Sequence, residues 1–230
     1  MTTTSPDRAV RQRDLVPPPA LADYHVLVVG VGAIGRQVAL QLAALGATAM
    51  TIVDDDVVAV ENLAVQGYAP HEIGLAKVEA VATSCRTLLP EVELDARPER
   101  FTRASLHSLS CLTGRWRPKL AVFACVDGMG GRRIVFETVR HHAALLVDGR
   151  MAGETLRVLT SPNPAQDGYY PTTLFEDNRA HPAPCTGRST LYAASVAAGL
   201  MLGRFAQTLR GQVPARDVLL QLAGDELAVL

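Results

Sequence analysis

A glycine-rich turn is the first part of the chain whose residue types and spacing suit a chemical role. Gly30, Gly32 and Gly35 form a Gly-x-Gly-x-x-Gly pattern directly after a short apolar run. Gly30 permits a tight turn, Gly32 lets a phosphate approach the backbone, and Gly35 allows a helix to pack closely on a strand. The free N–H groups at the start of the following helix, from Ala33 onward, favour an anion. The turn therefore predicts a binding site for the phosphates of a nucleotide.

An acidic residue, Asp54, follows the second apolar run of the chain, residues 50–53. Its spacing from the glycine turn is that of a nucleotide-binding strand–helix–strand unit, in which the carboxylate accepts hydrogen bonds from ribose hydroxyls. NAD, FAD and ATP all fit this arrangement. The turn and Asp54 together therefore predict a nucleotide and leave its identity open.

Strands and helices in alternation must position these residues. Apolar runs typical of strands buried on both faces of a parallel sheet occupy residues 25–29, 50–53, 120–125 and 143–147. Apolar residues recur at helical spacing over 34–45, 77–89, 131–142 and 191–209. Residues 91–94 predict an edge strand and 155–160 a further strand, before a long loop over 161–184. We expect an α/β fold with a doubly wound, mostly parallel, Rossmann-like sheet, a C-terminal antiparallel extension and an apolar helix.

Length and composition favour one domain. The chain has 230 residues, of which 48% are apolar, and an average domain has roughly 150. We expect an N-terminal arm and proline-rich linker at 1–19, with extended backbone at the prolines 17–19, and one domain over 20–230. The net charge of -1 argues against a nucleic-acid partner. The apolar stretch 191–202 is shorter than the roughly 20 residues of a membrane span. The N-terminus lacks a secretory signal, so the prediction is a cytoplasmic protein.

The four cysteines are widely spaced and form no Cys-x-x-Cys pair, which favours reduced thiols over a disulfide framework or a structural zinc site. Cys85, Cys111 and Cys125 are predicted core residues. Cys185 lies in the predicted loop near Arg188, where a thiol of lowered pKa would be reactive. A structural free thiol is the alternative for Cys185.

Five further pieces stand in a fixed order: Asp54-Asp55-Asp56, Glu61-Asn62-Leu63, Gln66, Gly74-Leu75-Ala76-Lys77 and Ala124-Cys125-Val126-Asp127. With the glycine turn, this ordered set resembles the ThiF, MoeB and ubiquitin-activating enzyme family. The resemblance covers most of residues 26–160, because Arg150-Met151-Ala152-Gly153 is also similar to the strand that comes next in MoeB-type proteins.

The resemblance implies a ThiF/MoeB-type fold and ATP- and Mg²⁺-dependent adenylation of a carboxylate. The usual substrate is the C-terminal glycine of a small ubiquitin-like or sulfur-carrier protein. By position, Asp54 would hold the ribose, Asn62 and Lys77 the phosphates, and Asp127 a Mg²⁺ ion. The implied nucleotide-binding set is Gly30, Gly32, Ala33, Gly35, Asp54, Asp56, Asn62, Gln66 and Lys77. The alternatives are that Asn62 and Asp127 merely cap helices and that Lys77 is a solvated residue.

The chain departs from the family pattern at Val65, where relatives usually carry an arginine before the residue that is Gln66 here. In MoeB-type dimers an arginine of the N-terminal arm reaches the ATP of the other subunit, and the pair Arg11-Gln12 resembles that arm. Arg8, Arg11 and Arg13 are therefore the expected substitutes for the missing cation, and the resemblance implies a homodimer in which Arg11 or Arg13 acts in catalysis. The alternative is a disordered basic tail.

A second departure concerns zinc. Many relatives carry two Cys-x-x-Cys pairs, the first just before a Leu-Phe pair, where this chain has Tyr170-Pro171-Thr172-Thr173. Zinc needs four ligands, so we expect none here. Relatives often have a cysteine at the place of Cys185 that takes the activated acyl group or forms a persulfide or acyl-disulfide.

Other functions stay open from the sequence alone. One is adenylation of a small carboxylic acid or peptide. Another is an NAD(P)-dependent Rossmann oxidoreductase, which leaves Lys77 and Asp127 unexplained. A third is a non-catalytic adaptor, for which Val65 is the best support.

Overall fold

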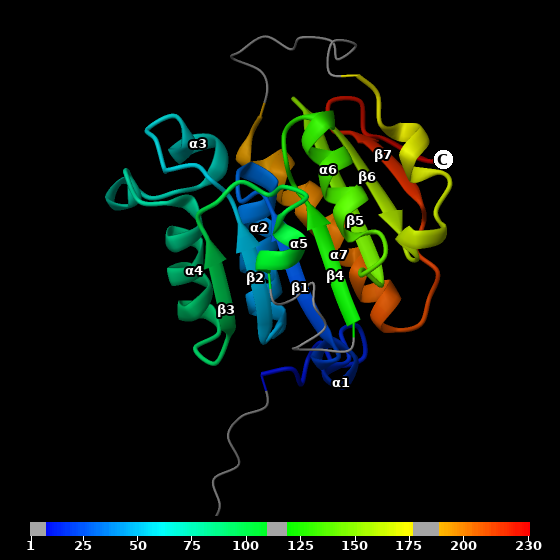
Figure 1. Ribbon diagram of the computed structural model, residues 1–230, viewed down its shortest axis with the longest axis horizontal. Helices are drawn as coiled ribbons and strands as arrows, with labels where there is room; N and C mark the ends of the chain where they lie inside the picture. The colour runs from blue at the N-terminus through cyan, green and yellow to red at the C-terminus, as the bar shows by residue number, and fades with distance from the viewer. Residues whose placement is uncertain (1–7, 110–118, 177–188) are drawn as a thin grey trace, which may run out of the picture.

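The computed structural model describes residues 8–109, 119–176 and 189–230. Within these residues, one sheet of eight strands has the order β3-β2-β1-β4-β5-β6-β7-β8 (Figure 1). The strands are β1 Tyr24–Val29, β2 Ala49–Val53, β3 Glu93–Arg97, β4 Lys119–Ala124, β5 Leu145–Ala152, β6 Thr155–Ser161, β7 Asp217–Gln221 and β8 Glu226–Val229. The first five in spatial order pair in parallel, and β5 to β8 pair antiparallel. The predicted fold class, including the antiparallel extension, is confirmed.

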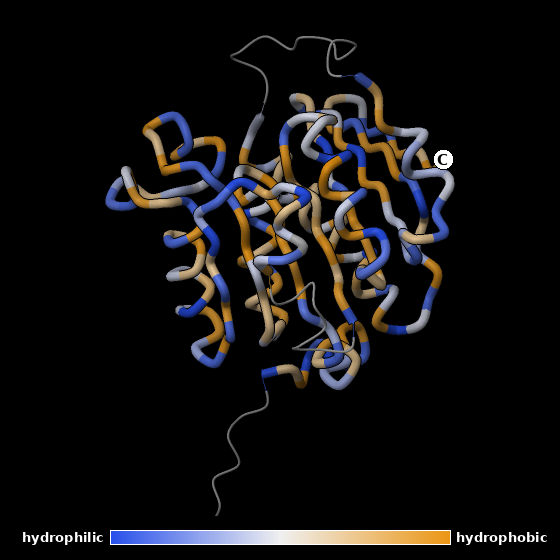
Figure 2. The backbone as a smooth tube through the Cα atoms, in the orientation of Figure 1, coloured by the Kyte–Doolittle hydropathy of each residue, from blue (hydrophilic) through white to orange (hydrophobic). Residues whose placement is uncertain are grey.

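Helices cover both faces of the sheet. The described helices are α1 Pro18–Ala22, α2 Ala33–Leu45, α3 Asn62–Gln66, α4 Lys77–Leu88, α5 Ser105–Ser108, α6 Met129–Val139 and α7 Leu191–Leu209. One core joins α2, α4 and α7 to Val26 and Val28 of β1, and a second joins α6 to Leu27 and Val29. Successive residues of a strand point to opposite faces, so β1 contributes to both cores. Figure 2 accordingly shows hydrophobic residues along the central strands. None of the described helices is long and apolar enough to cross a membrane.

The start of the described chain packs on the domain. Arg8 Nη2 donates to the carbonyl oxygens of Ala43, Ala44 and Leu88 at 3.2–3.4 Å, and Gln12 Nε2 donates to that of Leu45 at 2.8 Å. Carbonyl groups at helix C-termini lack intrahelical partners, so these bonds satisfy the ends of α2 and α4. Residues 8–16 therefore lie at the N-terminal edge of the parallel strands, at the bottom of Figure 1.

The extended backbone predicted for the prolines at 17–19 is confirmed at Pro17 and is wrong for Pro18 and Pro19, which are helical. Pro17 is the N-cap of α1, which begins at Pro18. The first helical N–H has no intrahelical partner, so a proline costs nothing there and its fixed φ suits a helix start.

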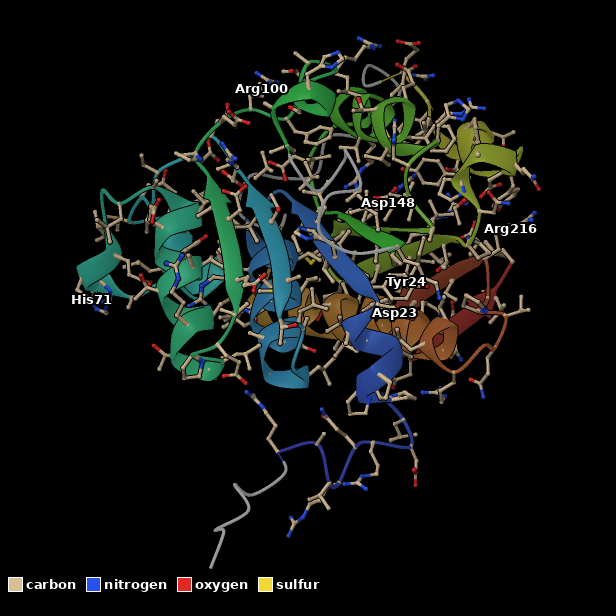
Figure 3. All side chains as sticks on the ribbon, turned by 60° about the horizontal axis from the view of Figure 1, so that its bottom comes forward. Asp23, Tyr24, His71, Arg100, Asp148 and Arg216 are labelled. Carbon is tan, nitrogen blue, oxygen red and sulfur yellow. The ribbon has the colours of Figure 1, made fainter. Side chains whose placement is uncertain are left out.

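A buried network of charges joins α6 to the antiparallel part of the sheet. Asp148 of β5 is fully buried beneath α6 (Figure 3) and pairs with Arg132 and, at 2.7 Å, with Nε of Arg150. Tyr170 donates to the same carboxylate at 3.1 Å, and Arg150 donates to the carbonyl oxygen and hydroxyl of Thr173 at 2.9 and 3.0 Å. Tyr170 and Thr173 stand where the family resemblance would place zinc-ligating cysteines. Both are buried and hydrogen-bonded to this network.

A second buried carboxylate, Asp217 of β7, should make the free energy of unfolding depend on pH in the acid range. It accepts two hydrogen bonds from Arg157, at 2.9 and 2.6 Å, and one from Tyr169 at 2.6 Å. Burial raises the pKa of Asp217, but the bonds from Arg157 and Tyr169 outweigh burial and hold that pKa below its usual value. Because the folded pKa lies below the unfolded one, the stabilisation is complete above the unfolded pKa of about 4 and is lost as the pH falls through the folded pKa.

The free energy of unfolding should therefore decline on acidification below about pH 4, and Asp217→Asn should flatten that decline because asparagine does not titrate. Urea unfolding of both proteins between pH 3 and pH 7 measures the difference. Parallel curves would show that Asp217 does not contribute to the acid sensitivity.

Candidate nucleotide site

The site lies where the strand order reverses. β2 pairs with one side of β1, and β4 pairs with the other. In open α/β sheets, ligands bind beyond the carboxyl ends of the strands at such a reversal. The glycine turn follows β1 and Asp127 follows β4, so both lie at this crevice.

The glycine turn has the backbone that the sequence predicts. Gly30 has a φ of 86°, and a Cβ there would lie 2.7 Å from the carbonyl oxygen of Cys125. A Cβ on Gly35 would lie 1.8 Å from the carbonyl oxygen of Gly30, which confirms the close packing of helix and strand. Among the described residues no side chain caps the N-terminus of α2 at Gly32, so its first N–H groups are not used by a cap. The geometry fits a phosphate, whose binding stays a prediction.

Asp54 ties the end of β2 to the glycine turn. Its Oδ2 accepts the N–H of Val31 at 2.7 Å, and its Oδ1 accepts the N–H of Asp56 at 2.9 Å. Burial raises the pKa of Asp54, and these two hydrogen bonds offset only part of the rise. A carboxylate oxygen can accept more than one hydrogen bond, so the side chain, which is half-buried, can still accept from a ribose hydroxyl.

Lys77 is buried, so the alternative of a solvated lysine is wrong. Its Nζ donates to Oδ2 of Asp56 at 2.7 Å, and its backbone N–H donates to the Asp56 carbonyl oxygen at 2.9 Å. The Asp56 side chain is 66% exposed and that of Lys77 only 6%, so the pair is open to solvent on the side of Asp56. In the described part of the chain, Asp54, Asp55 and Asp56 bring carboxylate oxygens within 4.8 Å of one another.

The two amides on α3 differ in their surroundings. Asn62 Oδ1 accepts the N–H of Ala59 at 2.8 Å, so this side chain orders the loop before α3, whose N-cap is Glu61. The Nε2 of Gln66 lies 3.9 Å from the position that a Cβ on Gly32 would take. The Oε1 of Gln66 is buried and has no hydrogen-bond partner among the described residues. A buried acceptor without a donor is rare in folded proteins, and a bound ligand or water would satisfy it.

Asp127 is exposed between β4 and α6. The helix begins at Met129, two residues before its predicted start, with Gly128 as N-cap and no capping side chain from the residues that the structure describes. The alternative that Asp127 caps this helix is therefore wrong. The metal role implied for Asp127 stays a prediction.

Other predicted residues lie elsewhere. Arg11 and Arg13 are exposed on the segment packed at the opposite edge of the sheet, so their own chain does not bring them to this site. Cys185 and Cys111 lie outside the described residues. Cys85 and Cys125 are buried free thiols, as predicted, and burial raises the pKa of Cys85 to about 12.

The sequence reasoning missed Arg36, which immediately follows the last glycine of the turn. Its guanidinium lies over the ring of Tyr68, 5.0 Å from the centroid, and the Tyr68 hydroxyl donates to the carbonyl oxygen of Val31 at 2.7 Å. An arginine directly after Gly35 was the available signal.

The chain is similar to several known proteins. The sulfur carrier protein ThiS adenylyltransferase of Escherichia coli is 29% identical over 168 residues, covering 72% of this chain and 63% of that protein. The SAMP-activating enzyme E1 of Haloferax volcanii is 33% identical over 90 residues, covering 39% of this chain and 33% of that protein. The chain thus spans less than two thirds of these relatives. A crystal structure of Escherichia coli MccB with succinimide superposes with a TM-score of 0.78 at 16% identity, covering 99% of this chain and 71% of that chain.

The model of the ThiF family matches residues 17–224 of this chain. That match includes every described strand of the parallel sheet and the whole candidate nucleotide site. The chain therefore belongs to the ThiF family.

Proposed function

We propose that this chain catalyses ATP- and Mg²⁺-dependent adenylation of a carboxylate, that of the C-terminal glycine of a small ubiquitin-like or sulfur-carrier protein. The observation that carries the proposal is buried Lys77, with its ammonium held at Asp56 on the edge where Asp54 meets the glycine turn. A dinucleotide-binding turn does not require that lysine. Membership of the ThiF family, which includes an adenylyltransferase acting on a sulfur carrier, supports adenylation over hydride transfer.

The reaction needs position and positive charge more than a base. A carboxylate oxygen attacks the α-phosphorus of ATP, the bond from that phosphorus to the bridging oxygen breaks, and pyrophosphate leaves. Lys77 and Asn62 contact the phosphates, and Asp54 accepts from the ribose. Asp127 would hold Mg²⁺, which would neutralise phosphate charge when bound. No proton moves and no thiol is needed, so acyl or sulfur transfer through Cys185 would be a separate, later step.

ATP–pyrophosphate exchange tests the function. The exchange should require a carboxylate and should be supported by a small protein ending in Gly-Gly. Exchange with only a short peptide or a small acid would assign the alternative substrate class. Nicotinamide nucleotide binding without any exchange would refute adenylation.

Asp127→Ala should lower exchange on the order of 10² to 10³ fold, because one preorganised charge contact to the metal–phosphate complex is lost. Folding should be unchanged, since Asp127 is exposed and does not cap α6. The matched control is Asp23→Ala, an exposed carboxylate at the start of β1, on the opposite edge (Figure 3). Near-normal exchange by the Asp127 variant over a Mg²⁺ titration would refute the metal role.

Arg11 and Arg13 should act on the partner's ATP in a homodimer. Point variants test this better than truncation, because truncation also removes the bonds of Arg8 and Gln12 to α2. An Arg11→Ala/Arg13→Ala variant and a Lys77→Ala variant should each be nearly inactive. Mixed in equal amounts, they should recover about one quarter of wild-type exchange, because random pairing of two subunits leaves that share of sites intact. No recovery, or full activity of the arginine variant alone, would refute catalysis across the dimer.

A further inference from the structure

Arg36 is held beside the candidate nucleotide site. Its guanidinium lies 5.0 Å from the centroid of the Tyr68 ring, and that ring is anchored to the glycine turn through Val31. A Cβ on Gly67 would lie 3.2 Å from Nη1 of Arg36, so the guanidinium also lies against the backbone at the end of α3. Side chains of a helix lean toward its N-terminus, which directs Arg36 toward the phosphate-binding end of α2.

The guanidinium lacks an anionic partner in the described part of the chain. Nε of Arg36 is buried without a hydrogen bond, and within residues 8–109, 119–176 and 189–230 no carboxylate forms an ion pair with this side chain. Arg150 and Arg157, by contrast, each pair with a buried carboxylate. A half-buried cation held in place by an aromatic ring but lacking an acceptor is suited to an anionic ligand.

The chain also lacks a cation at the neighbouring position. Val65, where the family usually has arginine, lines an apolar surface cavity with Ala64, Leu191 and Tyr192. Gln66 follows it and lies against Gly32, so α3 brings an amide but no charge to the turn. Arg36 of α2 reaches the same end of α3, at Gly67, the residue after Gln66.

We propose that Arg36 binds the triphosphate of ATP and thereby replaces the cation missing at Val65, with Tyr68 as the residue that positions it. The proposal rests on the proposed function, since it names a further residue of the same site. A planar guanidinium can donate two parallel hydrogen bonds to phosphate oxygens, which an ammonium group cannot.

Equilibrium binding of a non-hydrolysable ATP analogue and of adenosine, measured by calorimetry, tests the proposal without catalysis. Arg36→Gln should weaken binding of the analogue roughly 10- to 100-fold, the effect of one charge-assisted contact, and leave adenosine binding unchanged. Arg36→Lys should bind the analogue more tightly than Arg36→Gln and less tightly than the wild type, because lysine keeps the charge but lacks the planar pair of N–H donors. The matched control is Arg204→Gln, since Arg204 is also half-buried with an unpartnered Nε but lies on α7, on a different pocket with Leu15 and Leu45.

Unchanged binding of the analogue by Arg36→Gln would overturn the proposal and leave the proposed function intact. An equal loss for adenosine, or an equal loss in Arg204→Gln, would overturn it as well, because neither is a phosphate contact. Failure of the wild-type chain to bind the analogue would overturn both. Thermal unfolding of each variant shows whether it is folded. If Arg36→Gln does not fold, the affinity of Arg36→Lys for the analogue, compared with that of the wild type, tests the proposal instead.

Discussion

Lys77→Ala is expected to lower ATP–pyrophosphate exchange on the order of 10² to 10³ fold, because it removes a preorganised cation from the phosphates in the transition state. The fold should survive, since the carboxylate that loses its partner, Asp56, is 66% exposed and stays hydrated. The decrease should appear in kcat and persist at saturating ATP, if the contact strengthens as charge develops on the leaving pyrophosphate.

Lys119→Ala is the matched control for Lys77. Lys119 also pairs with an aspartate, Asp23, but at 3.9 Å and at the opposite edge of the sheet, where Figure 3 labels Asp23. An isolated exposed pair of this kind contributes about 0–1 kcal/mol, so neither exchange nor stability should change much. Near-normal exchange by Lys77→Ala, or an equal loss in Lys119→Ala, would remove Lys77 from the site.

Asp148→Ala should lower the free energy of unfolding by about 3–5 kcal/mol, the usual cost of removing one partner from a buried ion pair. The aspartate is completely buried, and its loss leaves the guanidinium groups of Arg132 and Arg150 without a compensating charge. Urea unfolding followed by circular dichroism measures the change.

Tyr170→Phe is the graded control for Asp148. It removes a single hydroxyl that donates to the same carboxylate at 3.1 Å, so about 1 kcal/mol is expected. Equal losses in both variants would mean that the charges of the network contribute no more than one neutral hydrogen bond.

The elements with strong periodicity were predictable from the sequence. Residues 191–209 repeat apolar residues at helical spacing, and α7 has these bounds. The bounds of β7 and β8 were not predicted, because β8 is largely exposed and carries no core pattern. Whether a proline run starts a helix depends on how the next residues pack, and periodicity does not report that.

At the site, the order of the motifs predicted that Asp54 and Gln66 lie beside the glycine turn, where the structure has them, and the roles of the site residues stay a prediction. The order did not predict which groups pair. The bond between Lys77 and Asp56 and the contact of Gln66 with Gly32 depend on how α3 and α4 dock. Asp148, at the end of the apolar run predicted over 143–147, was an overlooked sign of a buried ion pair, since a lone charge rarely enters such a strand.

The pairing of β1 with β4 has a consequence for folding. β5 and β6 meet through a tight turn at Gly153, so their pairing closes only a short loop. β1 and β4 pair from Tyr24 with Lys119 to Val29 with Ala124, which closes a loop of about two fifths of the chain and costs more entropy. The nucleotide site lies across these two strands. A chain whose hairpin has formed but whose central strands have not yet met therefore has no place for a nucleotide, and ligand binding stabilises only the complete sheet.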